Sequence, residues 1–339
     1  MKPLFLFAVT LLFISCSNYT GEDMFSINSR HKEVNRFDYV GIKLDDSNPS
    51  AMFSSISKLV VDEGRFYILD DRTSIVYLFD ENGNYLNQLN RIGQGPGEYI
   101  RLRDIDVEGD MLVVYDSRSN KLLRYDKRSL EFIDDLQASI RFNAFCRLEN
   151  GNYLMALRKD QGHRQIGIFD ESLNLLTDNL DYLADDPDER VRYSTLQVCG
   201  DTIVYAKPGY NNVYLFSRKD GELLDEFEII IDGDKEKLLH TTPLVVGQWI
   251  VGNYADAEDR YYYQISQSER KSAVAKVANR RNDIRIPLLP IAVQGGTLYA
   301  YMYNDLLERI GRSYLSEAEI KFVENGGFML CAYDMRASE

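Results

Sequence analysis

Six turns that contain glycine recur along the chain at nearly equal intervals, and this repeat limits the possible folds more than any other feature. The glycines lie 42 to 49 residues apart, at Gly64, Gly109, Gly151, Gly200, Gly247 and Gly296. Short runs of β-branched and aromatic residues flank these turns, as expected for strands. Repeats of this length with four short strands each are typical of β-propeller blades.

The unit at residues 56–89 shows the pattern most clearly. It contains four predicted strands, which cover 56–62, 65–69, 75–79 and 85–89. The last two are joined by Asp-Glu-Asn-Gly-Asn, a sequence that favours a hairpin turn. We therefore predict an all-β chain that forms a six-bladed β-propeller of four-stranded antiparallel blades. A pair of β-sandwiches is the alternative, but it does not account for six similar intervals.

The sixth unit lacks a fourth strand because the chain ends shortly after Tyr333. Residues 35–44 precede the first unit and alternate like a strand. We expect them to complete the sixth blade, since closing the ring removes unpaired strand edges. The same unit contains an insert at 304–325 with two predicted short helices, at 305–310 and 316–323, which we expect to lie over one face of the ring.

Two sets of positions within the units have an expected structural role. Apolar residues are predicted to pack between neighbouring blades at Val60, Ile68, Val76, Val113 and Leu215. Asp70, Asp71 and Asp116 follow the second strands of the first two units. These aspartates are expected either to face the central channel or to form turns.

The first residues resemble a bacterial lipoprotein signal. Lys2 is followed by an apolar run through Ile14 that is short for a membrane span, and the small residue Ser15 precedes Cys16. We predict a signal peptide at 1–15, lipidation of Cys16, a flexible tether at 16–33 and a propeller at 34–339. An ordinary secretory signal with an incidental cysteine is the alternative.

The predicted anchor and the charge of the chain both bear on location and partners. Lipidation would place the protein in the cell envelope, on the outer membrane, facing the periplasm or the cell surface, with membrane contact through the anchor alone. The net charge of −14 disfavours nucleic acid as a partner, because an acidic surface repels phosphate backbones. We expect a monomer.

Cysteine and metal motifs are sparse. The predicted mature chain keeps three cysteines within its repeats, Cys146, Cys199 and Cys331, which are too few and too widely spaced for a disulfide framework; pairing of any two is left open. The three histidines lack metal-ligand spacing. The acidic run at 181–190 lacks the spaced carboxylates of an EF-hand. No cofactor is predicted, and calcium in the channel is left open.

A glycine-rich motif, Gly93-Gln94-Gly95-Pro96-Gly97-Glu98-Tyr99, joins the first two units. With the blade pattern, Gly-x-Gly-Pro-Gly-Glu-aromatic resembles a family of six-bladed β-propeller lipoproteins common in Bacteroidetes, which is similar to the NHL-repeat propellers. The resemblance covers about residues 34–336. It implies the fold and the envelope location, and it implies no biochemical activity.

The motif does not fit a nucleotide-binding loop. Pro96 interrupts the glycines and a strand follows, whereas a dinucleotide fingerprint continues into a helix. The loop is either a crossover between blades that needs positive φ at glycine, or the lining of one mouth of the channel. In the second case the candidate ligand-binding residues are Gln94, Glu98, Tyr99, Arg101 and Arg103.

The arginines in and near the second unit favour an acidic ligand such as a uronic-acid glycan, although a charge cluster is commonly just solvated surface. A rigid ring with loops on two faces suits recognition. We therefore expect a lipid-anchored binding module whose partner is a glycan or a protein. No Gly-x-Ser-x-Gly elbow points to catalysis. The alternative is a channel-centred, metal-dependent hydrolase or lyase, whose ligands would come from separate blades and leave no local motif.

Overall fold

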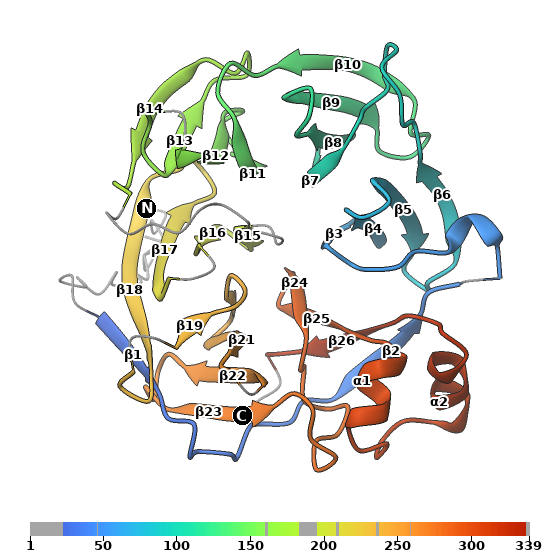
Figure 1. The fold of residues 1–339 in the computed structure, drawn as a ribbon, viewed down its shortest axis with the longest axis vertical. Helices are drawn as coiled ribbons and strands as arrows, with labels where there is room; N and C mark the ends of the chain where they lie inside the picture. The colour runs from blue at the N-terminus through green and yellow to red at the C-terminus, as the bar shows by residue number, and fades with distance from the viewer. Residues whose placement is uncertain are drawn as a thin grey trace, which may run out of the picture.

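Six sheets, antiparallel except for one added edge strand, surround a central axis in the computed structural model (Figure 1). The structure describes residues 23–336 except 46, 160–161, 183–194, 208–209, 235–236 and 258. Each sheet contains four consecutive strands or, in the last blade, three strands and one from the N-terminal region. The predicted six-bladed β-propeller is therefore confirmed.

The strands of the first three blades follow the chain without interruption. Blade one comprises β3 (Lys58–Asp62), β4 (Arg65–Asp70), β5 (Ile75–Asp80) and β6 (Tyr85–Leu89). Blade two comprises β7 (Leu102–Glu108), β8 (Met111–Asp116), β9 (Lys121–Asp126) and β10 (Phe132–Gln137). Blade three comprises β11 (Phe142–Arg147), β12 (Tyr153–Leu157), β13 (Ile166–Phe169) and β14 (Leu175–Asn179).

The last three blades carry additions to the same plan. Blade four comprises β15 (Leu196–Cys199), β16 (Thr202–Tyr205), β17 (Asn212–Ser217) and β18 (Leu223–Ile231). Blade five comprises β20 (Leu244–Val246), β21 (Trp249–Ala255), β22 (Arg260–Ser266) and β23 (Ser272–Lys276), with the short β19 (Leu238–Leu239) beside β21. Blade six contains β24 (Pro290–Gln294), β25 (Thr297–Met302) and β26 (Met329–Asp334).

The turn glycines that define the repeat all join the first and second strands of a blade. Their φ angles are all positive, from +56° at Gly109 and Gly247 to +90° at Gly151. A left-handed backbone strains residues with a Cβ atom but not glycine. The spacing of these glycines therefore reports the spacing of the blades.

The strand predicted at 35–44 closes the ring. Strand β2 (Tyr39–Lys43) pairs antiparallel with β26, and Tyr39 lies opposite Tyr333. The insert of blade six contains α1 (Asn304–Arg309) and α2 (Glu317–Glu324), which confirms the two predicted helices. They lie near β2 in the outer part of the blade in the view of Figure 1, and α2 contacts β2.

Strand β1 (Asp23–Ile27) is not predicted by the repeat. It pairs parallel with β18 and adds a fifth strand to blade four. Phe25 and Ile27 are buried there, since alternate residues of a strand point to the same side. The segment predicted as a tether, 16–33, thus contains a strand. The predicted signal at 1–15 and Cys16 lie outside the described residues, among which no helix is long and apolar enough to cross a membrane.

Apolar side chains fill the spaces between adjacent blades, as predicted. Val76 of blade one packs with Val114 of blade two, and Val113 of blade two packs with residues of blade three. The ring of Tyr115 stacks on Phe142 across that boundary, with centroids 3.8 Å apart. Of the five predicted core residues, three are buried (Ile68, Val76, Val113) and two are partly buried (Val60, Leu215).

A buried ion pair joins the innermost strands of blades one to three. Nζ of Lys58 lies 2.7 Å from Oδ1 of Asp104, and Oδ2 of Asp104 accepts a hydrogen bond of 2.9 Å from the backbone N–H of Phe145. Burial alone would lower the pKa of Lys58, but the charges of Asp104 and Asp106 raise it. The ammonium group therefore stays charged inside the protein and links the blades.

The channel is narrow on the side of blades four to six. Strand β15 of blade four contacts β24 of blade six directly, although blade five lies between them in the ring. The cavity that these strands border has a volume of only about 50 Å³. The larger space lies at one mouth of the channel.

Candidate functional site

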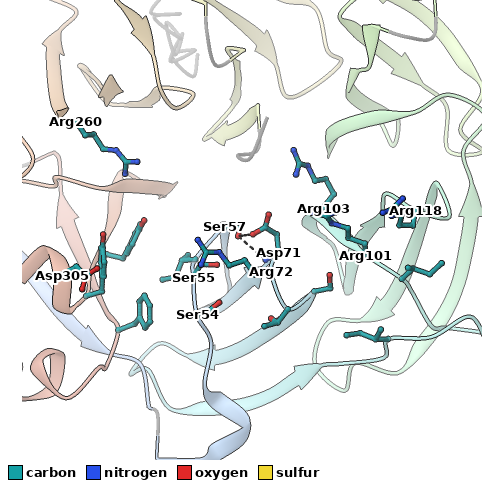
Figure 2. Close-up of a pocket in the computed structure, with 18 residues that line it drawn as sticks. Ser54, Ser55, Ser57, Asp71, Arg72, Arg101, Arg103, Arg118, Arg260 and Asp305 are labelled. Atoms are coloured by element: carbon teal, nitrogen blue, oxygen red, sulfur yellow. Dashed lines mark hydrogen bonds between the residues drawn. The ribbon is translucent and has the colours of Figure 1, made fainter. Parts of the chain in front are cut away.

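A cavity of about 1150 Å³ opens at this mouth (Figure 2). It is lined by loops that follow β4 and β8, by the segments that lead into β3 and β7, and by side chains of blades five and six. In an antiparallel blade the second strand ends on the side where the first begins. Equivalent loops of different blades therefore gather on one face of the ring.

The lining is rich in arginine although the chain as a whole is acidic. Five arginines and two aspartates border the cavity: Arg72, Arg101, Arg103, Arg118, Arg260, Asp71 and Asp305. Figure 2 shows Arg103 and Arg260 reaching into the opening from different sides. Within the described part of the chain, none of these arginines forms an ion pair with a carboxylate. Among the described residues, the lining of the mouth therefore carries more positive than negative charge.

Arg103 occupies a special position on the first strand of blade two. The pairing of β7 with β8 shifts between Leu102 and Asp104, so Arg103 is the extra residue of a β-bulge. Bulges redirect a side chain away from the regular sheet face. Burial lowers the pKa of the Arg103 guanidinium, while the nearby Asp71 partly offsets this effect. A charged, partly dehydrated guanidinium is favourable for binding an anion.

Asp116 holds the two neighbouring arginines in place. Its Oδ2 atom accepts hydrogen bonds from the backbone N–H of Ile100 (2.9 Å) and the hydroxyl of Ser119 (2.6 Å). Oδ1 accepts from the backbone N–H groups of Arg101 and Arg118, both at 3.0 Å. Burial would raise the pKa of Asp116, but these hydrogen bonds hold it below its usual range. One carboxylate thus fixes the loops that carry both arginines.

Asp70 plays the same part in blade one. Its carboxylate accepts hydrogen bonds from the backbone N–H and hydroxyl of Ser54, the hydroxyl of Ser55 and the backbone N–H of Arg72. Asp71 accepts a hydrogen bond of 2.5 Å from the Ser57 hydroxyl. Asp70 and Asp116 are therefore turn-forming residues, which resolves the two roles that the sequence left open for them.

An aromatic wall borders the opposite end of the cavity. The rings of Tyr301 and Tyr303 stack with centroids 5.9 Å apart, and Tyr303 stacks on Phe328 at 6.2 Å. All three side chains are partly exposed. Nearby, Arg260 donates a hydrogen bond of 2.9 Å to Nε2 of His240. Burial and the Arg260 charge lower the pKa of His240, so its imidazole is neutral and accepts this bond.

The cavity includes two of the five predicted ligand-binding residues, Arg101 and Arg103. Gln94 is exposed in the loop between the blades and does not line the cavity. Oε2 of Glu98 accepts a hydrogen bond of 2.8 Å from the backbone N–H of Gly95, within the same loop. Tyr99 is 0% exposed, and its hydroxyl donates to the carbonyl of Leu89 at 2.8 Å.

The glycine-rich motif thus forms a crossover between blades one and two. Gly97 has a φ of +69°, and a Cβ atom there would lie 2.6 Å from the ring of Phe132. The backbone N–H of Gly93 donates to the carbonyl of Tyr99 at 2.9 Å, which folds the loop on itself. The motif positions the start of blade two, and the residues immediately after it reach the cavity.

Sequence reasoning did not find Arg72, Arg260, Tyr303 or Asp305. A signal for Arg72 exists, because Asp70-Asp71-Arg72 and Asp116-Ser117-Arg118 repeat Asp-x-Arg at the end of a second strand. The residues of blade six have no such signal, since the helical insert interrupts the repeat. Their contribution to the cavity is visible only in the folded ring.

The cysteines and the acidic run named in the sequence can be placed only in part. Cys146, Cys199 and Cys331 are free and buried, and burial raises the pKa of each thiol. In the part of the chain that the structure describes, no group of three or more His, Cys, Asp or Glu residues is placed to hold a metal. Most of the acidic run at 181–190 lies outside the described residues.

Comparisons with known proteins agree with this fold. A family profile described as a 6-bladed beta-propeller matches residues 26–244. A crystal structure of a candidate exported protein from Bacteroides fragilis has a TM-score of 0.75 at 14% identity, covering 92% of this chain and 99% of that chain. The structure of BamB from Moraxella catarrhalis has a TM-score of 0.38 at 12% identity, covering 83% and 70% respectively, and supports no argument. No curated protein matches the chain.

Proposed function

The chain belongs to the DUF5128 family of six-bladed β-propellers, and from this premise we propose that it is a lipid-anchored, extracytoplasmic binding module for an acidic glycan. The ligand occupies the arginine-lined mouth of the channel. The ring acts as a rigid support, and its loops provide the contacts.

One observation carries this proposal: five arginines border one cavity without a carboxylate partner among the described residues. Guanidinium groups bind carboxylate or sulfate through paired hydrogen bonds, which are stronger than bonds between neutral groups. Serine hydroxyls that line the cavity donate hydrogen bonds to Asp70 and Asp71 and so stabilise the nearby negative charge within the protein. A concave site lined by arginines and half-buried aromatic rings fits an acidic sugar better than it fits the flat surface of a protein partner.

Replacing Arg101 and Arg103 together by glutamine tests this proposal. We expect affinity for a glucuronic-acid oligosaccharide to fall roughly 100- to 10,000-fold, because hydrogen bonds to charged groups contribute about 1.5–3 kcal/mol each and two such groups are removed. Titration calorimetry at two salt concentrations measures the loss. Arg128→Gln is the matched control, because this exposed arginine pairs with Glu63 away from the cavity. Equal affinities for the variants, or binding only of acidic peptides, would refute the glycan assignment.

Anchoring in the envelope is supported by the signal pattern that ends at Cys16 and by the likeness to the candidate exported protein of Bacteroides fragilis. Six residues separate Cys16 from Asp23, the first residue of β1. Cell fractionation tests the anchor. The full chain should sediment with membranes and need detergent for release, whereas Cys16→Ala should be soluble. Membrane association that survives the substitution would show that the anchor is not a lipid on Cys16.

A further inference from the structure

The ligand-binding cavity is elongated. A second cavity of about 300 Å³ shares Arg260, Tyr303 and Asp305 with the large one. The two cavities therefore adjoin where residues of blades five and six line them. In Figure 2, Arg101 and Arg118 lie at one end of the opening, and Asp305 lies at the other. The larger cavity alone slightly exceeds the roughly 300–1,000 Å³ that small-molecule sites occupy. The space therefore suits a chain of several rings rather than one.

The two ends of the cavity differ in charge. Arg101, Arg103 and Arg118 make the end at blade two positive. At the far end, two arginines (Arg260, Arg309) line the second cavity together with two aspartates (Asp259, Asp305), so charges of both signs balance there. Asp305 is exposed and forms no ion pair or hydrogen bond with the described residues. A carboxylate in that position repels an acidic group but accepts hydrogen bonds from hydroxyls. The far end therefore attracts an acidic sugar ring less than the end at blade two does, and the free carboxylate of Asp305 favours a ring whose polar groups are hydroxyls.

The aromatic wall gives the far end a flat apolar surface. Tyr303 stacks with Tyr301 and with Phe328 at centroid distances of 5.9 and 6.2 Å, so the rings are offset and part of the Tyr303 ring stays exposed while its rotation is restricted. A sugar ring has an apolar face of C–H groups and a rim of hydroxyls. Its face can pack on the exposed part of Tyr303 while its hydroxyls donate to Asp305.

On the basis of the proposed function, we propose that the cavity binds a linear oligosaccharide in which acidic and neutral residues are both present. The acidic group lies at Arg101 and Arg103, and a neutral ring stacks on Tyr303 with its hydroxyls toward Asp305. Glycans with a carboxylate on every ring are disfavoured by Asp305.

Two hexasaccharides separate this arrangement from simple anion binding. The hyaluronan hexasaccharide alternates glucuronic acid with a neutral sugar, whereas hexagalacturonate has a carboxylate on every ring. We expect wild-type protein to bind the alternating chain more tightly. Asp305→Asn should raise the affinity for hexagalacturonate about fivefold and change that for the alternating chain by less than about twofold. Glu308→Gln is the control, because Glu308 is an exposed carboxylate of α1 outside both cavities.

Substitutions of Tyr303 test the stacking contact. Tyr303→Leu keeps an apolar side chain but removes the ring, and we expect the affinity for the alternating hexasaccharide to fall about tenfold. Tyr303→Phe keeps the ring and should bind within about twofold of the wild type. Matching melting temperatures of the variants would show that the fold is retained.

The possible outcomes distinguish failure of this inference from failure of the proposed function on which it rests. Failure of wild-type protein to bind either hexasaccharide would overturn the proposed function itself. Equal binding of both hexasaccharides, unchanged by Asp305→Asn and Tyr303→Leu but lost on removal of Arg101 and Arg103, would overturn the two-ended arrangement alone. Preference for the alternating chain that depends on Asp305 and Tyr303 would support both.

Discussion

Val113→Asp is expected to unfold the propeller under conditions in which the wild-type chain is folded. Val113 lies in β8, is 0% exposed and packs between blades two and three. An unpaired carboxylate buried there costs several kcal/mol. That cost is comparable with the roughly 5–15 kcal/mol by which folded domains are usually stabilised. Circular dichroism during thermal and urea unfolding measures the loss.

Val40→Asp provides the matched control for this substitution. Val40 lies in the ring-closing strand β2 and is 66% exposed, so the same new carboxylate stays hydrated. We expect its free energy of unfolding to change by less than about 1 kcal/mol. Similar losses at Val113 and Val40 would contradict the assignment of which strand faces are buried.

Lys58→Met is expected to lower the free energy of unfolding by about 3–5 kcal/mol, because it leaves the buried carboxylate of Asp104 without its counter-charge. The pair spans blades one and two, and Asp104 also accepts a hydrogen bond from the backbone N–H of Phe145 in blade three. The loss should therefore weaken three adjacent blades together. Urea denaturation monitored by intrinsic fluorescence measures the change.

Two further variants show whether the loss of stability comes from the unpaired charge of Asp104. Lys271→Met removes an exposed lysine paired with Glu269 and should cost less than about 1 kcal/mol. Adding Asp104→Asn to Lys58→Met removes the unpaired charge while keeping an oxygen for the N–H of Phe145, so most of the stability should return. A Lys58→Met variant as stable as Lys271→Met would show that the buried pair does not hold the blades together.

The ring itself was predictable because its signals are local. Each blade begins with two strands joined by a glycine turn, and the spacing of Gly64, Gly109 and their equivalents counts the blades. Closure by β2 was predictable because blade six lacked a strand. Strand β1 was not predictable. Its parallel pairing with β18 joins residues about 200 positions apart, and β1 lies outside the repeat.

The site was only partly predictable. Arg101 and Arg103 were found because they follow a recognisable motif, but Gln94, Glu98 and Tyr99 of that motif lie outside the cavity. An alternating pattern shows that a strand has two faces, yet the β-bulge at Arg103 changes where its side chain points. Which residues of a crossover loop reach the cavity depends on tertiary contacts, such as the close approach of Gly97 to the ring of Phe132.

The amino-acid sequence by itself determined the number of blades, the strand that closes the ring and the positions of the turns, because turn chemistry and hydrophobic alternation act between neighbours in the chain. Only the tertiary structure decided which polar side chains share the mouth. Arg72, Arg103, Arg260 and Tyr303 come from four different blades, and ring closure alone brings them together. In the part of the chain that the structure describes, the folded ring pairs none of these arginines with a carboxylate, and the resulting excess of positive charge in the lining is the basis of the proposed function.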